Sequence, residues 1–351
     1  MKNAKKVKRS LPFSAAVWYD RSRTGKGGNA VKRFVIEKND AGQRLDKFLT
    51  KTVPNLPQSL LYKSIRLKRI KLNRKRAEIS TRLQEGDVVE LYLNDEFFAP
   101  APTRYDFLSA PKRLDILYED ANILLLNKKA GLLSHPDDRE YIDTLITRVK
   151  RYLYETGEYD PANEASFTPA LVNRIDRNTA GIVIAAKTAE ALRVLNQKMK
   201  DRELHKYYLC VIHGTLDEKE GLLEGWLWKD EAKNKVFIHK QKKSPDDKAI
   251  RTKYRVLREG NGLSLLEVDL LTGRTHQIRA HFASIGHPLL GDGKYGTNAQ
   301  NKKSGLKKQC LCSYKLQFDF TTDAGALAYL NGRSFEIKDV WFREEFDTLE
   351  G

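Results

Sequence analysis

The segment LVNRIDRNTAGIVIAAKT, residues 171–188, places one carboxylate, Asp176, between Arg174 and Arg177. A carboxylate can attack or stabilise an electron-poor carbon, and a neighbouring guanidinium favours its ionised form. An aspartate in a polar turn is most often only a turn residue. Here, however, the apolar run 181–186 follows, which predicts a strand buried on both faces. We therefore take Asp176 as a candidate catalytic group held at the start of a rigid strand.

Other chemically suggestive groups predict less. His276 and His281 are five residues apart on an expected helix and would point about 140° apart, which disfavours a shared metal ion. His287 lies beyond the end of that helix. The glycine-rich GDGKYG lacks the spacing of a phosphate-binding loop, and Cys210 lies in an apolar strand, where packing is the simpler role. We expect neither a metal site nor a nucleotide site.

The elements that must position Asp176 read as strands mixed with helices. NILLLNKK, GIVIAAK and HKYYLCVIHG each predict a strand, and LSLLEVDLLTGRTHQIRAHFASIG predicts a strand, a polar turn and a helix. Thr188 can cap the helix that follows the second strand. Because strands and helices do not alternate strictly, the pattern favours an α+β fold with a mixed, mainly antiparallel central sheet and flanking helices.

Positive charge is concentrated at one end of the chain. The net charge is +17, and residues 1–76 hold 22 Lys or Arg against four acidic residues. The remaining 275 residues hold 41 basic and 42 acidic side chains. Such an end next to a nearly neutral body favours contact with a polyanion.

Four regions follow from this pattern. Residues 1–33 predict a disordered basic tail, 34–94 a small α/β domain, 95–113 a proline-containing linker, and 114–351 the body. Between 44 and 76 the small domain holds eleven basic residues and one acidic residue, which disfavours a merely solvated helix pair. Its candidate residues for contact with a polyanion are Lys63, Arg66, Lys68, Arg69, Lys71 and Arg74.

The sequence also bears on the compartment. No apolar stretch approaches the roughly 20 residues of a membrane helix, and the start of the chain lacks a convincing signal-peptide cleavage site. Three cysteines form no metal-type spacing and are typical of reduced thiols. We expect a cytoplasmic monomer without membrane contact.

Two sets of motifs resemble known families. QRLDKFL, SLLYKSIRLKRIKLN and LQEGDVVELYL resemble the S-four-like (alpha-L) RNA-binding domain, over about sixty residues. NRIDRNTAG, KYYLCVIHG and LLTGRTHQIRAHFASIGHPLLGDGKYG, in this order, resemble the RluA-type pseudouridine synthases over more than half of the chain. The second resemblance implies an α+β fold with a cleft, isomerisation of uridine in RNA, and no cofactor.

The same resemblance implies roles for individual residues. Asp176 corresponds to the essential carboxylate, and Arg279 in HQIRAH to the arginine that pairs with it. Tyr208 corresponds to the tyrosine that packs on the target uracil and takes part in proton transfer. Arg174 corresponds to the arginine that fills the space left by the extruded base, and Arg177 is a further RNA-binding candidate.

Some positions depart from the family pattern, and alternatives follow. Asn173 stands where the family usually has histidine, Ile175 replaces leucine, and Lys129 replaces proline. Asn173 in particular weakens any transfer of substrate identity from family members that have histidine there.

We favour large-subunit ribosomal RNA as the substrate, with transfer RNA as an alternative. A non-catalytic RNA-binding or ribosome-associated protein is the rival class, and joint retention of Asp176, Tyr208 and Arg279 argues against it.

Overall fold

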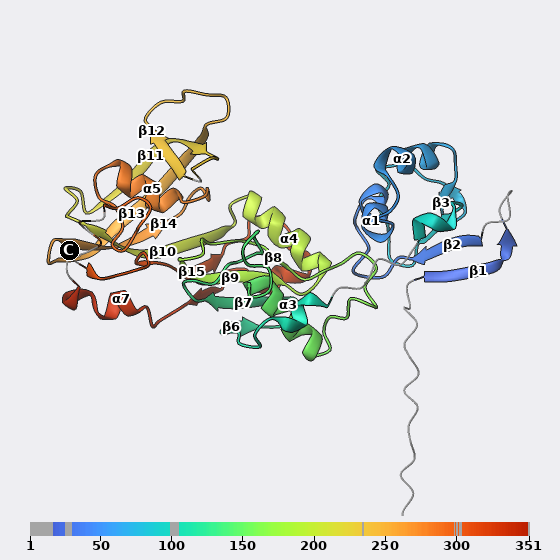
Figure 1. Ribbon diagram of the computed structural model, residues 1–351, viewed down its shortest axis with the longest axis horizontal. Helices are drawn as coiled ribbons and strands as arrows, with labels where there is room; N and C mark the ends of the chain where they lie inside the picture. Colours follow the sequence, from blue (N-terminus) through green and yellow to red (C-terminus); the bar gives the residue numbers. More distant parts are fainter. Residues whose placement is uncertain are drawn as a thin grey trace, which may run out of the picture. The chain divides into compact units, whose positions relative to one another are not determined.

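The computed structural model describes residues 17–24, 30–98, 105–233, 235–297, 299, 301 and 304–349. The chain divides into two compact units, each with its own core (Figure 1). The N-terminal unit comprises the chain up to Tyr105 together with Leu153–Thr168, and the large unit comprises Asp106–Tyr152 and Pro169–Gly351. Among the described residues, no helix combines the length and apolar character needed to cross a bilayer.

The N-terminal unit packs two helices, α1 (Leu45–Thr52) and α2 (Gln58–Arg66), against a sheet. In its described residues the strand order is β1-β2-β5-β3-β4, with all neighbours antiparallel. The strands are β1 (Val17–Thr24), β2 (Ala30–Val35), β3 (Ile70–Leu72), β4 (Lys75–Arg76) and β5 (Val88–Leu91). Apolar residues at helical spacing, such as Leu45, Phe48 and Leu49, are buried, and their burial explains why these short helices form.

The structure differs from the expected regions at some residues of 1–33 and at 153–168, and the expected linker contains the boundary between the two units. Residues 17–24 and 30–33, expected in a disordered tail, form strands β1 and β2, while residues 1–16 and 25–29 of that tail lie outside the described part. The expected linker contains the 3-10 helices η1 (Asp95–Phe98) and η2 (Asp106–Ser109), and residues 99–104 are not described. The expected body also contributes residues 153–168 to the N-terminal unit. There, the side chain of Asn39 donates to Glu164 and that of Gln43 donates to Ser166.

The large unit is built on a mixed, mainly antiparallel sheet, as the sequence predicts. Its order among the described residues is β12-β11-β13-β14-β10-β15-β9-β7-β6, with β16 beside β15 and β8 beside β9. Among the strand pairs of the described residues in this unit, β15 and β9 run parallel and the others run antiparallel. The strands are β6 (Ile116–Glu119), β7 (Ile123–Lys128), β8 (Ala170–Leu171), β9 (Ala180–Ala186), β10 (Leu204–His213), β11 (Glu220–Asp230), β12 (Lys235–His239), β13 (Lys248–Gly260), β14 (Leu263–Asp269), β15 (Leu311–Phe318) and β16 (Ser334–Glu336).

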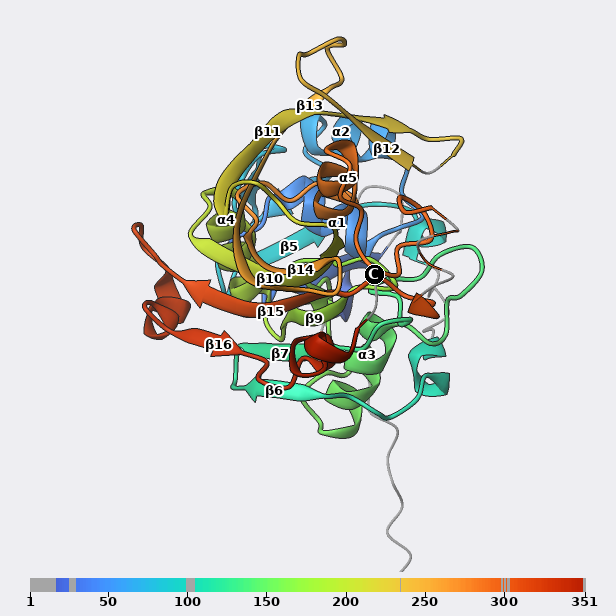
Figure 2. The ribbon, with the colours of Figure 1, turned by 90° about the vertical axis from the view of Figure 1, so that its left-hand side faces the viewer.

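Helices cover this sheet. They are α3 (Leu145–Glu155), α4 (Ala189–Lys200), α5 (Gln277–Ser284) and α7 (Trp341–Glu344), with the 3-10 helices η3 (Gly325–Leu330) and η4 (Phe346–Thr348). Thr188 caps α4, its side chain accepting the backbone N–H of Ala191, as expected. Helix α5 packs Ala280 against the strands β11 to β13, which curve around it in Figure 2.

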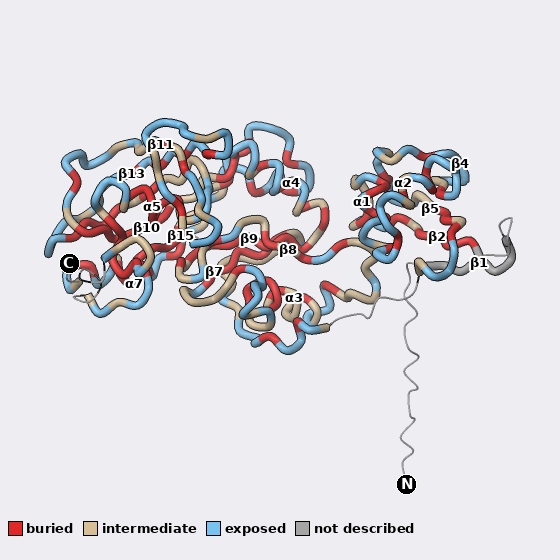
Figure 3. The backbone as a smooth tube through the Cα atoms, turned by 45° about the horizontal axis from the view of Figure 1, so that its top comes forward, coloured by how far each residue is buried: buried red, intermediate tan, exposed pale blue. Residues whose placement is uncertain are grey.

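Strand β9 lies in the main core and is the predicted strand buried on both faces. Residues 181–186 are all buried, and Figure 3 shows the buried stretch through β7 and β9. Its first half pairs with β15, where Gly181 lies directly opposite Ser313. Gly181 has φ +118°, and a Cβ there would overlap the Ser313 backbone. Glycine is thus required where the chain passes from the Asp176 loop into the sheet.

We expect Gly181→Ala to destabilise the large unit by about 2–5 kcal/mol, because alanine is strained at this φ and overpacks the β15 backbone. The melting temperature should fall by roughly 5–15 °C. Gly262→Ala is the matched control, since Gly262 also has positive φ (+73°) but meets no atom within 4 Å. Equal melting temperatures for the two variants would show that the close approach to β15 is unimportant.

Candidate active site

Asp176 lies in the loop between β8 and β9, and hydrogen bonds hold this loop at both ends. On the incoming side, the Asn173 side chain accepts the N–H of Ile184 at 2.8 Å and donates to the Ile182 carbonyl at 3.3 Å. On the outgoing side, the Thr179 N–H donates to the carbonyl of Asp176 at 3.1 Å. The loop is therefore fixed to the core strand that it precedes, as a catalytic carboxylate requires.

A buried lysine also holds the Asp176 loop through hydrogen bonds to backbone carbonyls. The Lys128 ammonium, at the end of β7, donates to the carbonyls of Leu132 at 2.7 Å, Arg177 at 3.0 Å and Lys129 at 3.2 Å. Burial lowers the pKa of Lys128 to about 7, and the charge of Asp176 acts in the opposite direction. Three carbonyl acceptors use all three N–H groups of the ammonium, so this geometry favours the charged form.

Arg279 connects Asp176 to a second carboxylate. From α5, its Nη1 donates to Asp176 Oδ2 at 2.9 Å, while Nε and Nη2 donate to the two oxygens of Asp292 at 2.7 and 2.9 Å. Asp292 is fully buried and Arg279 is 7% exposed. Burial lowers the pKa of Arg279, but its hydrogen bonds and attraction to Asp292 and Asp176 outweigh burial and raise it. The guanidinium is thus a permanent charge whose position Asp292 fixes.

His276 contacts Asp176 from the side opposite the loop. Its Nε2 lies 3.7 Å from Asp176 Oδ2, and its Nδ1 lies 2.9 Å from the Tyr295 hydroxyl. The Tyr295 oxygen also accepts the N–H of Val236 at 3.0 Å. Burial lowers the pKa of His276 to about 4, although Asp176 opposes this shift. The imidazole is therefore neutral near pH 7.

Tyr208 supplies an aromatic wall from β10. It is 6% exposed, and burial raises the pKa of its phenol to about 12 despite a hydrogen bond with Ser313. The phenol is therefore protonated near pH 7. A flat apolar ring with a polar tip is suited to packing on a base.

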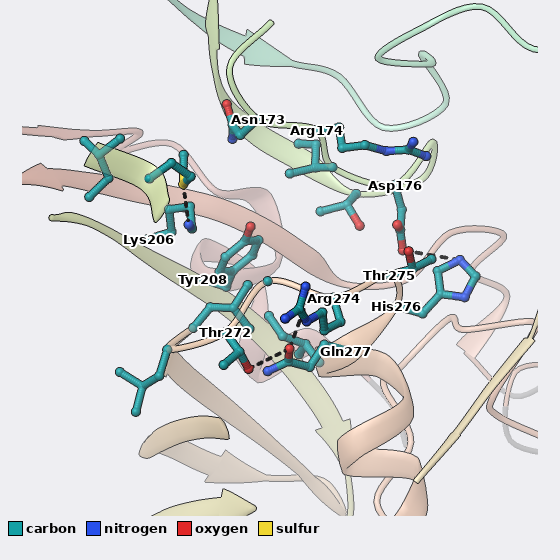
Figure 4. Close-up of a pocket in the computed structure, with 18 of the residues that line it drawn as sticks. Asn173, Arg174, Asp176, Lys206, Tyr208, Thr272, Arg274, Thr275, His276 and Gln277 are labelled. Carbon is teal, nitrogen blue, oxygen red and sulfur yellow. Dashed lines mark hydrogen bonds and ion pairs between the residues drawn. The ribbon is translucent and has the colours of Figure 1, made fainter. Parts of the chain in front are cut away.

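Asp176, Tyr208, His276 and Arg279 line one pocket with a volume of about 800 Å³ in the large unit. Figure 4 shows Asp176 and Tyr208 facing this pocket from the loop and from β10. Arg174 also lines it and is exposed, whereas Arg177 lines a neighbouring pocket and donates to the Gly131 carbonyl at 3.1 Å. The structure therefore brings Asp176, Tyr208, Arg279 and Arg174 together, and directs Arg177 elsewhere.

The candidate RNA-binding residues of the N-terminal unit lie on and after α2. Lys63, Arg66, Lys68, Arg69 and Arg74 are exposed. Lys71 is half-buried, and its ammonium lies 5.1 Å from the ring centroid of Tyr92. The two turns that carry Lys68 and Arg74 have positive φ at these residues, 59° and 66°.

Sequence reasoning missed Asp292, Tyr295 and Lys128 as parts of the site. Asp292 and Tyr295 both belong to GDGKYG, which has no nucleotide-binding spacing but ends the longest family-like motif. The signal that could have indicated them was the presence of a carboxylate and a phenol inside a motif shared with the family. The histidines that suggested metal binding have other partners, since His281 bonds Thr252 and His287 bonds the His213 carbonyl.

The arrangement supports carboxylate chemistry on a flat, uncharged ring system. Asp176 shares with Asp292 a guanidinium that cannot deprotonate, and its side chain is 25% exposed, so a substrate can reach it. The neutral His276 and Tyr208 provide donors that do not compete for the carboxylate as counter-charges. A nucleophilic or electrostatic role at a sugar or a base fits this geometry.

Comparison with known proteins agrees with this description. The RNA pseudouridylate synthase family model matches residues 122–284. An uncharacterized RNA pseudouridine synthase of Mycoplasma genitalium is 32% identical over 292 residues, covering 82% of this chain and 89% of that protein. The ribosomal large subunit pseudouridine synthase C of Vibrio cholerae is 31% identical, with 82% and 89% covered.

A solved structure shows the same fold. The human RNA pseudouridylate synthase domain containing 1 superposes with a TM-score of 0.53 at 20% identity, covering 72% of this chain and 91% of that one. Sequence relatives at this identity and coverage, together with the family model, place the chain without ambiguity. The protein belongs to the RluA-type RNA pseudouridine synthases.

Proposed function

We propose that this enzyme converts uridine of large-subunit ribosomal RNA to pseudouridine, with Asp176 as its essential carboxylate. The observation that carries the proposal is the Asp176 carboxylate, held by Arg279 at 2.9 Å in the pocket that Tyr208 also lines. The names of several relatives, including those from Vibrio cholerae and Haemophilus ducreyi, support ribosomal RNA as the substrate class.

The reaction is an isomerisation in which the atoms balance. The bond between N1 of uracil and C1′ of ribose breaks, a bond between C5 and C1′ forms, C5 loses a proton and N1 gains one. Asp176 can act by attack at C1′ or at the pyrimidine ring, and either adduct must later release the carboxylate. Arg279, which Asp292 holds in place, orients the carboxylate throughout.

The substrate must leave the base stack before Asp176 can reach it. The pocket has room for a nucleotide, and the buried ring of Tyr208 provides a surface on which the uracil packs. Arg174, exposed at the pocket beside Asp176, is placed to occupy the gap in the RNA. The phenol of Tyr208 is also the neutral group available to take part in the proton transfer.

The substrate class is tested by mapping pseudouridines in cells that lack this gene. We expect one or more pseudouridines to disappear from large-subunit ribosomal RNA and to return when the wild-type chain is supplied, but not when Asp176→Asn is supplied. Loss confined to transfer RNA would assign the enzyme to that substrate instead. An unchanged map in both RNAs would contradict the proposed activity.

The N-terminal unit contributes an RNA grip in this proposal. Lys63, Arg66, Lys68 and Arg69 are exposed and follow one another along α2 and the turn after it. The segment 44–76 holds a single acid, Asp46, whose carboxylate bonds Arg44, so the lysines and arginines of α2 have no acidic neighbour within this segment. Clustered cations of this kind release counterions when they bind phosphates.

We expect Lys63→Gln with Arg66→Gln to weaken RNA binding and to reduce the slope of log affinity against log salt by about 0.7–0.9 for each lost phosphate contact. Turnover at saturating RNA should stay near that of the wild type, because the pocket of the large unit is untouched. Lys219→Gln with Lys338→Gln, exposed in the large unit, is the control of equal charge. An identical salt slope in both double variants would remove α2 from the RNA interface.

A further inference from the structure

Two large aromatic rings lie exposed on the edge hairpin of the large unit. Trp228 of β11 pairs directly with Phe237 of β12, and their rings stack with centroids 5.5 Å apart and planes at 29°. Trp228 is 41% exposed and Phe237 37%. Adjacent exposed rings of this size typically mark a contact surface rather than a core.

These rings lie on the face of the hairpin opposite α5. Neighbouring residues along a strand point to opposite faces, and Leu227 and Val236 are buried in the cluster that contains Ala280 of α5. Trp228 and Phe237 therefore point away from this cluster. Strand β12 also ends the sheet, so the face is accessible from the edge as well as from the front.

Lysines surround the rings. The ammonium of Lys235 lies 5.9 Å from the centroid of Phe237, and that of Lys242 lies 5.3 Å from the centroid of Trp226, two residues before Trp228. Residues 229–248 hold seven lysines and four acidic residues. We call Trp226, Trp228, Phe237, Lys235 and Lys242 the edge face. Its charge favours a polyanion, and its rings favour a partner with flat groups.

Lys235 lies between the edge face and the surroundings of the active site. Its ammonium also lies 5.2 Å from the centroid of Tyr295, and the Tyr295 hydroxyl bonds His276, which faces Asp176. Tyr295 packs against the cluster on the α5 side of the hairpin, so Lys235 lies at the margin between the two faces. The rings and Asp176 belong to the same unit.

The geometry points to a second RNA contact: the edge face binds the unpaired strand that flanks the target uridine, with bases stacked on Trp228 and Phe237 and phosphates at Lys235 and Lys242. Base stacking on exposed aromatic rings beside lysines is how proteins hold single-stranded RNA. A protein partner would also use aromatic rings, but a lysine-rich rim next to an RNA pocket favours RNA. The inference rests on RNA as the substrate and is independent of the role of Asp176.

The test is RNA binding by the full chain carrying Trp228→Ala with Phe237→Ala. The probe is a single-stranded oligouridylate, measured by fluorescence anisotropy. We expect the affinity to fall about tenfold, the loss of roughly one stacked base. Trp228→Phe with Phe237→Tyr keeps both rings and should bind within about twofold of the wild type. Lys235→Gln should weaken binding. It should also reduce the slope of log affinity against log salt concentration by the amount expected for about one lost phosphate contact.

Trp341→Ala is the matched control. Trp341 is similarly exposed, at 45%, but it belongs to helix α7 and not to the hairpin of β11 and β12. Its affinity should equal that of the wild type. Wild-type affinity in the Trp228→Ala, Phe237→Ala variant would overturn the inference, and loss of self-association in sedimentation by that variant would assign the face to a second copy of the chain. Because binding is read without turnover, this failure is distinct from failure of the proposed reaction.

Discussion

Replacing Asp176 with asparagine should abolish pseudouridine formation while leaving a folded protein that binds RNA. The amide has nearly the same shape and its oxygen can still accept from Arg279 Nη1, which now lies at 2.9 Å from the carboxylate. Arg279 also keeps both contacts with Asp292, so its charge remains balanced. An amide, however, can neither attack carbon nor carry the negative charge that the reaction requires.

We expect the turnover to fall by at least about 10³-fold, as when a nucleophile is removed from other enzymes. The release of labelled hydrogen from C5 of uracil measures it directly, and binding of the same RNA measures the retained affinity. Asp339→Asn, at an exposed position outside the pocket, should behave as the wild type. A variant with a tenth of wild-type turnover at position 176 would exclude Asp176 from the chemistry.

Replacing Arg279 with alanine should cost both activity and stability, and Asp292 explains the stability. The guanidinium is the two-pronged partner of a carboxylate with 0% exposure, whereas the Asp176 side chain is 25% exposed. Removing one partner of a buried pair costs about 3–5 kcal/mol, which in a unit of this size lowers the melting temperature by roughly 10 °C. Arg279→Lys should rescue poorly, because one ammonium cannot replace a planar fork.

A double-mutant cycle identifies which carboxylate, Asp292 or Asp176, is destabilised when Arg279 is removed. Arg279→Ala with Asp292→Asn should be more stable than the sum of the single effects predicts, by about 1–3 kcal/mol, because a neutral amide needs no counter-charge. Arg279→Ala with Asp176→Asn should recover less. Arg255→Ala is the control, since Arg255 pairs with Glu267 at 2.9 Å on the surface with 61% of its side chain exposed. Additive effects for the pair 279 and 292 would show that Asp292 does not hold Arg279.

The same cycle has a pH signature. In the wild type, burial raises the pKa of Asp292 but the hydrogen bonds and charge of Arg279 outweigh burial and lower it, so this group stabilises the fold above pH 4 and loses that contribution in acid. Without Arg279, the backbone N–H groups of Lys294 and Tyr295 still bond Asp292, but the guanidinium no longer offsets burial, and we expect the pKa to lie above its unfolded value. The folded variant then binds more protons than the unfolded chain, and the stability difference from the wild type should shrink as pH falls from 7 to 5.

The sequence allowed much of the large unit to be predicted, because its signals are local. The apolar run 181–186 predicts a buried strand and Thr188 can cap the next helix, and the structure has both features. The pairing of Asp176 with Arg279, 103 residues apart, came from the resemblance to a family. No local pattern connects these two positions.

The features that escaped prediction depend on distant partners. Asp292 was not singled out within the glycine-rich GDGKYG, and its burial becomes visible only when α5 brings Arg279 beside it. Residues 17–24 were expected in a tail because residues 1–33 as a whole hold ten basic residues and one acid, yet residues 17–24 pair with β2 as a strand. The stacked pair of Trp228 and Phe237 likewise requires the register of β11 with β12.

The segment Leu153–Thr168 has a consequence for how such enzymes are assembled in evolution. It interrupts the large unit in sequence and belongs to the N-terminal unit, where Glu164 and Ser166 bond Asn39 and Gln43. Asp40, whose pKa is raised by burial, also bonds Ser166. A recombination event at residue 105 would separate these partners, although it falls between two compact units. Exchange of N-terminal modules between relatives is therefore constrained by co-inheritance of residues 153–168, and a functional chimera must carry both pieces from the same parent.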